Sequence, residues 1–222
     1  MNNSDKIRIC ELFDSVPSVL SPLFDGKDYP WEVIGKIKDF IASFIKNPVG
    51  DYKEIAEGVY VGRDVKISPL ATIMPPAIIG DGTELRPGAF VRGNVITGRD
   101  CVIGNSTEIK NSLLLDKVAA PHYNYIGDSI IGNHAHLGAG VICSNLKSDK
   151  TPVTVKGKEN YGTGLKKMGA ILGDYAEIGC GCVLNPGTVV GKHTNVYPLT
   201  SLRGVIPEKR IVKDGKTVVI KK

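Results

Sequence analysis

Aromatic side chains are scarce in this chain. Phenylalanine, tryptophan and tyrosine make up 6% of the 222 residues, and there is a single tryptophan. A core filled by large aromatic rings is therefore not expected. Hydrophobic residues nevertheless form 42% of the chain, and 26 residues are glycine, which favours an aliphatic core joined by tight corners. The length predicts one large domain, or one domain with a small addition.

Long apolar runs are also missing, because every hydrophobic stretch is far shorter than the 20 or so residues that cross a bilayer. The first residues, MNNSDKIRICELFD, carry charges where a signal peptide needs an apolar stretch. We therefore expect a cytoplasmic protein without a membrane partner.

The five cysteines do not form a disulfide or zinc pattern. Their number is odd and their spacing irregular, and Cys180 and Cys182 have no second pair to complete a metal site. Reduced thiols are expected. The formal net charge of +5 suits anionic small molecules as well as nucleic acid. It selects neither, and nothing else in the sequence favours nucleic acid.

A repeat of six residues dominates the chain from residue 61. Nine of the ten residues at this spacing are branched aliphatics, and the residue four places later is mostly small. The aliphatic series runs Val61, Ile67, Ile73, Ile79, Leu85, Val91, Thr97, Ile103, Ile109 and Leu115. The phase slips near 121–130 and again over 144–171. It then returns at Leu172, Ile178, Leu184, Val190, Val196 and Leu202.

A period of six fits short strands joined by tight corners. It is not a whole number of 3.6-residue helical turns, and glycine recurs directly after the aliphatic residue, as at Gly98 and Gly104, which plain alternating strands would not require. Coils that stack at the strand spacing of about 4.8 Å form a parallel β-helix solenoid. The spacing does not give the handedness of the coil.

Three segments lie outside the repeat. Residues 1–50 contain a helical pattern and are expected to form a helical N-terminal cap over the first coil. Residues 144–171 are a polar insertion with six lysines, and long loops in regular folds are often functional. The β-helix is expected over 51–207. Residues 208–222 should form a C-terminal hairpin that turns at Asp214 and Gly215.

A group of motifs lies between residues 84 and 145: ELRPGAFVRGN, CVIGNSTEIKNS, HYNYIGD, HAHLGAG and ICSN. In this order the chain resembles the hexapeptide-repeat acyltransferases, in particular the C-terminal acetyltransferase domain of the bifunctional UDP-N-acetylglucosamine pyrophosphorylase/glucosamine-1-phosphate acetyltransferase. The resemblance covers roughly residues 60–205. It implies an all-β fold, a left-handed parallel β-helix with a short helical N-terminal segment and a long inserted loop. It also implies acetyl-CoA as cosubstrate and a homotrimer.

The resemblance implies a role for each of nine residues. His122 takes the place of the general base. The resemblance implies that four residues bind the amino-sugar phosphate or nucleotide-sugar: Arg86, Lys110, Tyr125 and His136. It implies that four others bind acetyl-CoA: Ala139, Asn145, Cys180 and Pro198. The Ala139 main-chain N–H would face the thioester carbonyl.

These residue types suit acyl transfer to an amine. Histidine titrates near neutral pH and can remove a proton from the attacking amine. A fixed backbone donor stabilises the oxyanion of the tetrahedral intermediate. Arginine and lysine suit a phosphate. No covalent enzyme intermediate is required, so Cys101 and Cys143, which occupy repeat positions, are expected in the core.

The sequence departs from the family at two positions and lacks one domain. His136 stands where the family has an asparagine that touches the sugar, and Leu146 replaces a tyrosine. Lys166 or Lys167 could supply a family lysine from the insertion. No glycine-rich nucleotidyl motif is present, so transfer of a uridylyl group is not expected.

Two alternatives remain open. The first is a metal enzyme of the γ-carbonic-anhydrase kind, with His122, His134 and His136 as ligands, although the last two are only two residues apart. The second is a non-catalytic scaffold that binds sugar nucleotides. The sequence does not identify the acceptor, and it does not distinguish acetyl from a larger acyl group.

Overall fold

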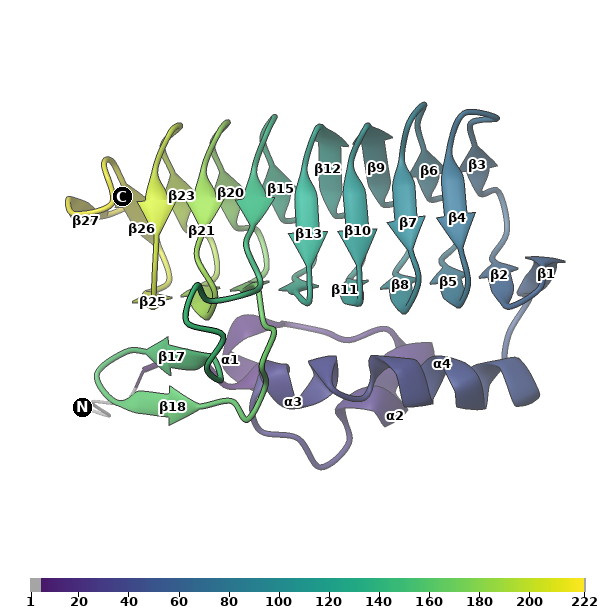
Figure 1. Cartoon of the computed structure of the whole chain (residues 1–222), viewed down its shortest axis with the longest axis horizontal. Helices are drawn as coiled ribbons and strands as arrows, with labels where there is room; N and C mark the ends of the chain where they lie inside the picture. Colours follow the sequence, from purple (N-terminus) through teal and green to yellow (C-terminus); the bar gives the residue numbers. More distant parts are fainter. Residues whose placement is uncertain (1–4, 222) are drawn as a thin grey trace.

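A computed structural model describes residues 5–221, which form a stack of coils with three flat faces (Figure 1). We call the three sheets face A, face B and face C. Each coil contributes one short strand to each face in that order, and neighbouring coils pair in parallel. Corners between a face B strand and the next face C strand form the B–C edge, and the other two edges are named in the same way.

The strands are two to four residues long. Face A contains β1 (Lys53–Ala56), β2 (Val59–Val61), β5 (Ala77–Ile79), β8 (Val95–Thr97), β11 (Ser112–Leu114), β14 (Ile130–Ile131), β19 (Ala170–Leu172), β22 (Thr188–Val190) and β25 (Val205–Ile206). Face B contains β3 (Lys66–Ile67), β6 (Glu84–Leu85), β9 (Val102–Asn105), β12 (Ala119–His122), β15 (His136–Leu137), β20 (Glu177–Ile178), β23 (Asn195–Val196), β26 (Arg210–Val212) and β27 (Val218–Ile220). Face C contains β4 (Thr72–Met74), β7 (Phe90–Arg92), β10 (Glu108–Lys110), β13 (Tyr125–Gly127), β16 (Ile142–Cys143), β21 (Val183–Leu184) and β24 (Ser201–Leu202).

Aliphatic residues at the repeat positions fill the interior of the prism, as the period predicts. The interior also holds Cys101 and Cys143, both fully buried. One detail of the predicted phase is wrong. The interior residue after Ile109 is Leu114, not Leu115, because this coil is one residue shorter, and Leu115 faces outward from face A. The slip therefore begins earlier than residue 121.

The N-terminal helices cover face A rather than the end of the stack. They are α1 (Ile9–Leu12), α2 (Ser21–Phe24), α3 (Pro30–Ile34) and α4 (Ile37–Lys46). In Figure 1 they lie along the side of the stack. Outward side chains of six successive face A strands share a hydrophobic cluster with them: Ile78, Ile96, Leu113, Ile130, Ile171 and Val189. Repeat positions reveal only the inward side of each strand, so the sequence analysis did not detect this second apolar layer.

A buried carboxylate fixes this segment to the solenoid. Asp174, which is 1% exposed, accepts the main-chain N–H groups of Asp14 and Asn133, each at 2.7 Å. Burial raises its pKa, against the lowering effect of these hydrogen bonds. No helix in residues 5–221 is long and apolar enough to cross a membrane.

The insertion and the tail each form a hairpin. In the insertion, β17 (Thr154–Lys156) pairs with β18 (Asn160–Gly162) in the antiparallel sense. This hairpin lies on the same side of the stack as the helices (Figure 1). At the C-terminal end β26 and β27 form the expected antiparallel hairpin, with Asp214 accepting main-chain N–H groups in the turn. Faces B and C are not covered by any other element of residues 5–221.

Candidate active site

His122 lies at the B–C edge, where β12 ends. Its main-chain N–H contacts the side-chain oxygen of Asn124 at 3.3 Å, and its carbonyl oxygen accepts the N–H of Gly140 at 3.0 Å. Asn124 is buried and donates to the Gly138 carbonyl at 2.7 Å. The backbone of His122 is thus fixed by the corner, while its side chain is exposed and makes no hydrogen bond with residues 5–221. The imidazole is free to meet a ligand.

Four of the predicted residues form one column along the B–C edge. The column contains His122, Ala139, Cys180 and Pro198, one residue from each of four successive coils. Corner hydrogen bonds join these coils: Gly140 donates to His122 at 3.0 Å, Gly181 to Ala139 at 2.8 Å, and Leu199 to Cys180 at 2.9 Å. The structure therefore brings the predicted general base and three predicted acetyl-CoA residues into line.

Two backbone donors along this column are unpaired. Within residues 5–221, the main-chain N–H groups of Ala139 and Cys180 make no hydrogen bond. Their neighbours on both sides, by contrast, bond to the adjacent coil. An unpaired donor at a fixed corner is suited to bind a carbonyl oxygen or an oxyanion. The Ala139 donor is one coil, or about 4.8 Å, along the stack from His122.

A shallow hollow of about 260 Å³ adjoins the column on face B. It is lined by His136, Cys180 and Pro198, together with Glu177 and Asn195. The side-chain oxygen of Asn195 is buried and has no hydrogen-bond partner within residues 5–221. Because this oxygen is shielded from solvent, it does not face the open space of the hollow.

His136 lies in this hollow on face B, whereas two of the other predicted sugar-binding residues, Lys110 and Tyr125, are in strands of face C. Its Nδ1 atom is 3.1 Å from a carboxylate oxygen of Glu177 in the next coil. The sequence analysis predicted that it binds the sugar. Its position associates it instead with Cys180 and Pro198, the residues predicted at acetyl-CoA.

Face C carries a cluster of charged residues where its strands end, toward the C–A edge. Lys110 ends β10, and its ammonium group has no hydrogen bond or ion pair within residues 5–221. The register of β7 and β10 pairs Val91 with Ile109, which places Arg92 beside Lys110 on the outer surface. Arg92 contacts Glu108 at 2.5 Å. Two cations from adjacent coils therefore project from the same surface.

Arg86 lies apart from this cluster. It occupies the B–C edge directly after β6, and its guanidinium group is 3.2 Å from the carboxylate of Glu84 on face B. The length of a face C strand separates it from Lys110 along the coil. Arg92, which the sequence analysis did not consider, lies beside Lys110 instead. Its spacing of 18 residues from Lys110, three repeats of six, was the available signal.

Tyr125 and Asn145 meet above Gly127, one coil beyond Lys110. A Cβ atom added at Gly127 would lie 2.6 Å from the Tyr125 hydroxyl and 2.7 Å from the Asn145 side-chain nitrogen. Burial raises the pKa of Tyr125, and the nearby Glu108 adds to this effect. Asn145 also donates to Asp128, which accepts a second hydrogen bond from Asn111 at 2.7 Å. The predicted pair is therefore held in place by a polar network.

The insertion leaves the solenoid directly from this network. Leu146 and Lys167 form an isolated bridge at its base, and the Met168 N–H donates to the Asn145 carbonyl at 2.9 Å. Lys166 and Lys167 are exposed there.

Within residues 5–221, the histidines and cysteines are not gathered into a group of three metal-ligating side chains. His134 stacks on Tyr175 at the A–B edge, so it does not converge with His122. Burial raises the pKa of Cys101 and of Cys143 to about 12, which leaves both thiols protonated and unreactive.

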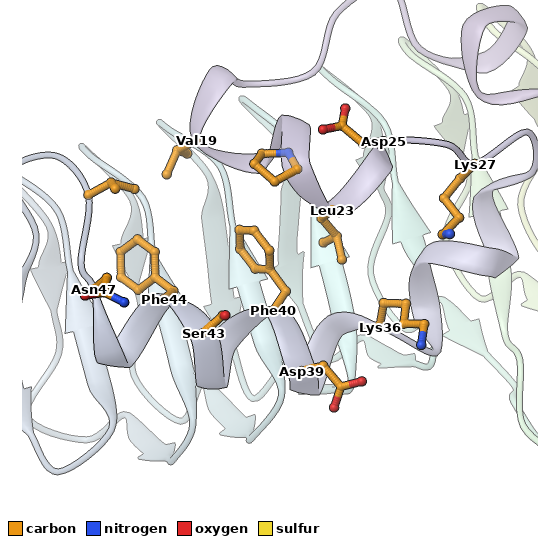
Figure 2. A pocket seen from close by; sticks show the side chains of 12 residues that line it. Val19, Leu23, Asp25, Lys27, Lys36, Asp39, Phe40, Ser43, Phe44 and Asn47 are labelled. Carbon is orange, nitrogen blue, oxygen red and sulfur yellow. The ribbon is translucent and has the colours of Figure 1, made fainter.

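A larger hollow lies elsewhere, between α2 and α4. It measures about 560 Å³ and is lined by apolar side chains such as Leu23, Phe40 and Phe44. Figure 2 shows these side chains pointing toward one another from the two segments. The hollow belongs to the helical layer over face A, whereas His122 is at the B–C edge.

Comparisons with known proteins match the solenoid. A family model described as the GMPPB C-terminal domain matches residues 73–161. The bifunctional protein GlmU of Methanococcus vannielii is 30% identical over 202 residues, which cover 87% of this chain and 47% of the relative. A bifunctional sugar-1-phosphate nucleotidylyltransferase/acetyltransferase of Sulfurisphaera tokodaii is 31% identical over 175 residues, which cover 76% of this chain and 43% of the relative.

Solved structures give a more distant match. PerB from Caulobacter crescentus, in complex with CoA and GDP-perosamine, is 18% identical over 71% of this chain and 57% of that chain, with a TM-score of 0.43. The chain spans about half the length of the curated relatives it matches.

Proposed function

Because the chain belongs to the hexapeptide-repeat acyltransferase family, we propose that it transfers an acetyl group from acetyl-CoA to an amino-sugar phosphate resembling glucosamine 1-phosphate, or to a nucleotide-linked amino sugar. One observation carries this proposal. His122 heads a column in which the unpaired N–H groups of Ala139 and Cys180 follow at successive coils. A base and an oxyanion donor are the two groups that acyl transfer to an amine requires.

Acetyl-CoA binds along the B–C edge in this proposal. The Ala139 N–H receives the thioester oxygen, and the hollow beside Cys180 and Pro198 receives the pantetheine arm. That arm carries amide groups, whose carbonyl oxygens suit the unpaired Cys180 N–H. The fit rests on the unpaired N–H groups of Ala139 and Cys180. Asn145 completes the site at the base of the insertion.

The acceptor binds over face C. Lys110 has no partner of its own, and Arg92 lies beside it, so a phosphate dianion placed there receives two positive charges. Tyr125, held against Asn145, contacts the sugar. In this arrangement Arg92 takes the phosphate-binding role that the sequence analysis gave to Arg86.

His122 moves the proton during the reaction. The acceptor amine attacks the thioester carbon as His122 accepts a proton from the amine nitrogen. The tetrahedral intermediate places its negative oxygen on the Ala139 N–H. The carbon–sulfur bond then breaks, and the protonated His122 returns its proton to the leaving CoA sulfur. No enzyme thiol reacts, which agrees with the raised pKa values of Cys101 and Cys143.

We also propose that the protein is a homotrimer with shared sites. Face A is covered by the chain's own helices, whereas faces B and C, on either side of His122, have no cover within residues 5–221. Neighbouring prisms would enclose the exposed imidazole. Sedimentation analysis that gives a monomer at micromolar concentration would contradict this part of the proposal.

Mass spectrometry of the product tests the reaction directly. Glucosamine 1-phosphate is incubated with acetyl-CoA and the purified protein, with His122→Ala as control. A product heavier by one acetyl group, greatly reduced in the variant, supports both the reaction and the base. Thiol-reactive dyes are unsuitable because two of the five cysteines are exposed. Binding of the sugar phosphate without transfer would instead favour the non-catalytic scaffold.

A further inference from the structure

A hollow lined by cationic side chains lies where the insertion folds back on the C–A edge. It measures about 320 Å³ and is lined by Lys147, Asp149, Thr154, Lys156, Asn160, Pro186 and Arg203. We call it the insertion hollow. None of these residues belongs to the column at the B–C edge or to the cluster around Lys110. The sequence analysis noted the lysine content of the insertion but assigned it no ligand.

Two glycines dock the insertion closely against the solenoid. Gly187 and Gly204 have φ values of +82° and +78°, a conformation that glycine adopts readily. A Cβ atom at Gly204 would be 2.3 Å from the Lys156 carbonyl oxygen, and one at Gly187 would be 2.9 Å from that of Thr154. Strand β17 therefore rests directly on the edge. This contact places Lys156 against the coil that carries Arg203.

The charges in the insertion hollow are unbalanced. Lys147 is paired with Asp149 at 3.3 Å, the one carboxylate in the lining. The side chains of Lys156 and Arg203 make no hydrogen bond and no ion pair within residues 5–221. Two uncompensated cations thus line one concave site, together with the amide of Asn160. Converging cations with no acidic partner are suited to bind phosphate groups, arginine through two parallel hydrogen bonds and lysine as a point charge.

The insertion hollow is close to the candidate active site. Asn145 and Lys147 are two residues apart, so their Cα atoms are separated by at most about 7 Å. A ligand that reaches from Tyr125 and Asn145 along the insertion would therefore meet these cations. From this geometry we infer that the insertion hollow binds the diphosphate of a nucleotide. The assignment to a substrate rests on the proposed acetyl transfer, whereas binding of a diphosphate does not.

Two substrates carry such a group: CoA and a nucleotide-linked sugar. Calorimetric titration of the full chain with CoA and with UDP, at low ionic strength, separates them. The test variants are Arg203→Gln and Lys156→Gln, both at exposed positions. Lys150→Gln is the matched control, because Lys150 is an exposed lysine of the same insertion that does not line the hollow.

We expect either test variant to raise the Kd for one of the two ligands by roughly tenfold, as the loss of a charge-assisted hydrogen bond implies. The control should bind both ligands like wild type. Weaker CoA binding assigns the hollow to the donor, and weaker UDP binding to the acceptor. Unchanged affinities, or no binding of either ligand by wild type, would overturn the inference. An equal loss in Lys150→Gln would also overturn it, because net charge alone would then explain the binding.

The binding test of the insertion hollow can fail or succeed separately from the test of acetyl transfer. If Arg203→Gln weakens nucleotide binding while wild type transfers no acetyl group, the insertion hollow stands and the proposed function fails. If wild type transfers acetyl groups and both test variants bind and turn over normally, the reverse holds.

Discussion

The carbonyl oxygen of His122 accepts the main-chain N–H of Gly140 across 3.0 Å. This bond fixes the offset between two coils at the B–C edge. The preceding N–H, that of Ala139, is unpaired within residues 5–221 and lies one coil from His122. The same hydrogen bond that stacks the corner thus positions the proposed base and the proposed oxyanion donor relative to each other.

Replacing His122 with alanine should abolish most of the transfer without unfolding the protein. The side chain is exposed and makes no hydrogen bond within residues 5–221, so its loss leaves the corner intact. Removing a general base typically lowers turnover by about 10²–10⁴-fold. The measurement is kcat by mass spectrometry, with thermal unfolding as the check on folding. His134→Ala, at the A–B edge, serves as control. Normal turnover in His122→Ala would exclude this residue from the mechanism.

We predict different effects on the acceptor KM for substitutions of Arg92 and of Arg86. Each arginine is paired with a carboxylate, Arg92 with Glu108 and Arg86 with Glu84, but only Arg92 lies beside Lys110. Arg92→Gln should raise KM for the amino-sugar phosphate by about tenfold or more, as expected for a lost hydrogen bond to a charged group, with a smaller change in KM for acetyl-CoA. Arg86→Gln should change both values little.

Steady-state kinetics of the two variants side by side decide between them. A larger rise in acceptor KM for Arg86→Gln than for Arg92→Gln would restore the assignment made from the sequence motif.

Much of the fold follows from the sequence because each coil repeats the same local chemistry. Aliphatic residues such as Ile103 and Ile178 recur at the interior position, and each of them points from its strand into the prism. Coils of 17 rather than 18 residues shift the phase, which is why Leu115 was misplaced. The position of the helices could not be predicted, since their contacts with Ile96 or Ile130 depend on outward residues that follow no period.

In the candidate site too, some features follow from the repeat and others depend on how the chain packs. His122, Ala139, Cys180 and Pro198 were found from motifs, and their alignment in one column follows from the repeat. Arg86 was chosen because LRPGA is a recognisable string, although motif order does not state which face a side chain occupies. Register places Arg92 beside Lys110, and the kinetic comparison of the two arginines tests which of them binds the phosphate. The insertion hollow depends on how a hairpin docks on the C–A edge, which spacing alone does not contain.

Alkylation of Cys180 should block acetyl transfer. Cys10 and Cys180 are the exposed thiols, whereas Cys101, Cys143 and Cys182 are buried. Burial raises the pKa of all three buried thiols, to about 12 for Cys101 and Cys143. Roughly 10⁻⁴ of each of these two is therefore thiolate at pH 8, and thiolate is the reactive form. Iodoacetamide should therefore label Cys10 and Cys180 in the folded protein. Because Cys180 lines the hollow proposed for pantetheine, CoA should protect it.

Peptide mass spectrometry with and without CoA measures the protection. The Cys10→Ser variant should lose activity on alkylation as wild type does, and Cys180→Ser should resist. Equal labelling of Cys180 in the presence of saturating CoA would mean that the coenzyme does not lie along the B–C edge.

The substitution Gly127→Ala tests whether the positions of the Tyr125 and Asn145 side chains matter for activity. The φ of Gly127 is not in the left-handed region, so alanine is compatible with the backbone, yet a Cβ atom there would lie only 2.6 Å from the Tyr125 hydroxyl. The two side chains must therefore shift. A displacement of about 1 Å in an active site can lower the rate by about 10²-fold, and we expect a loss of kcat/KM of that order in Gly127→Ala.

Gly162→Ala is the matched control for this steric effect. Gly162 lies in β18, also without a positive φ, and no atom is within 4 Å of an added Cβ. Both variants should retain cooperative thermal unfolding, so a loss of activity confined to Gly127→Ala would come from the displaced pair. If Gly127→Ala instead turned over like Gly162→Ala, the contact between Tyr125 and Asn145 would be a packing feature of face C, and the acceptor would depend on Arg92 and Lys110 alone.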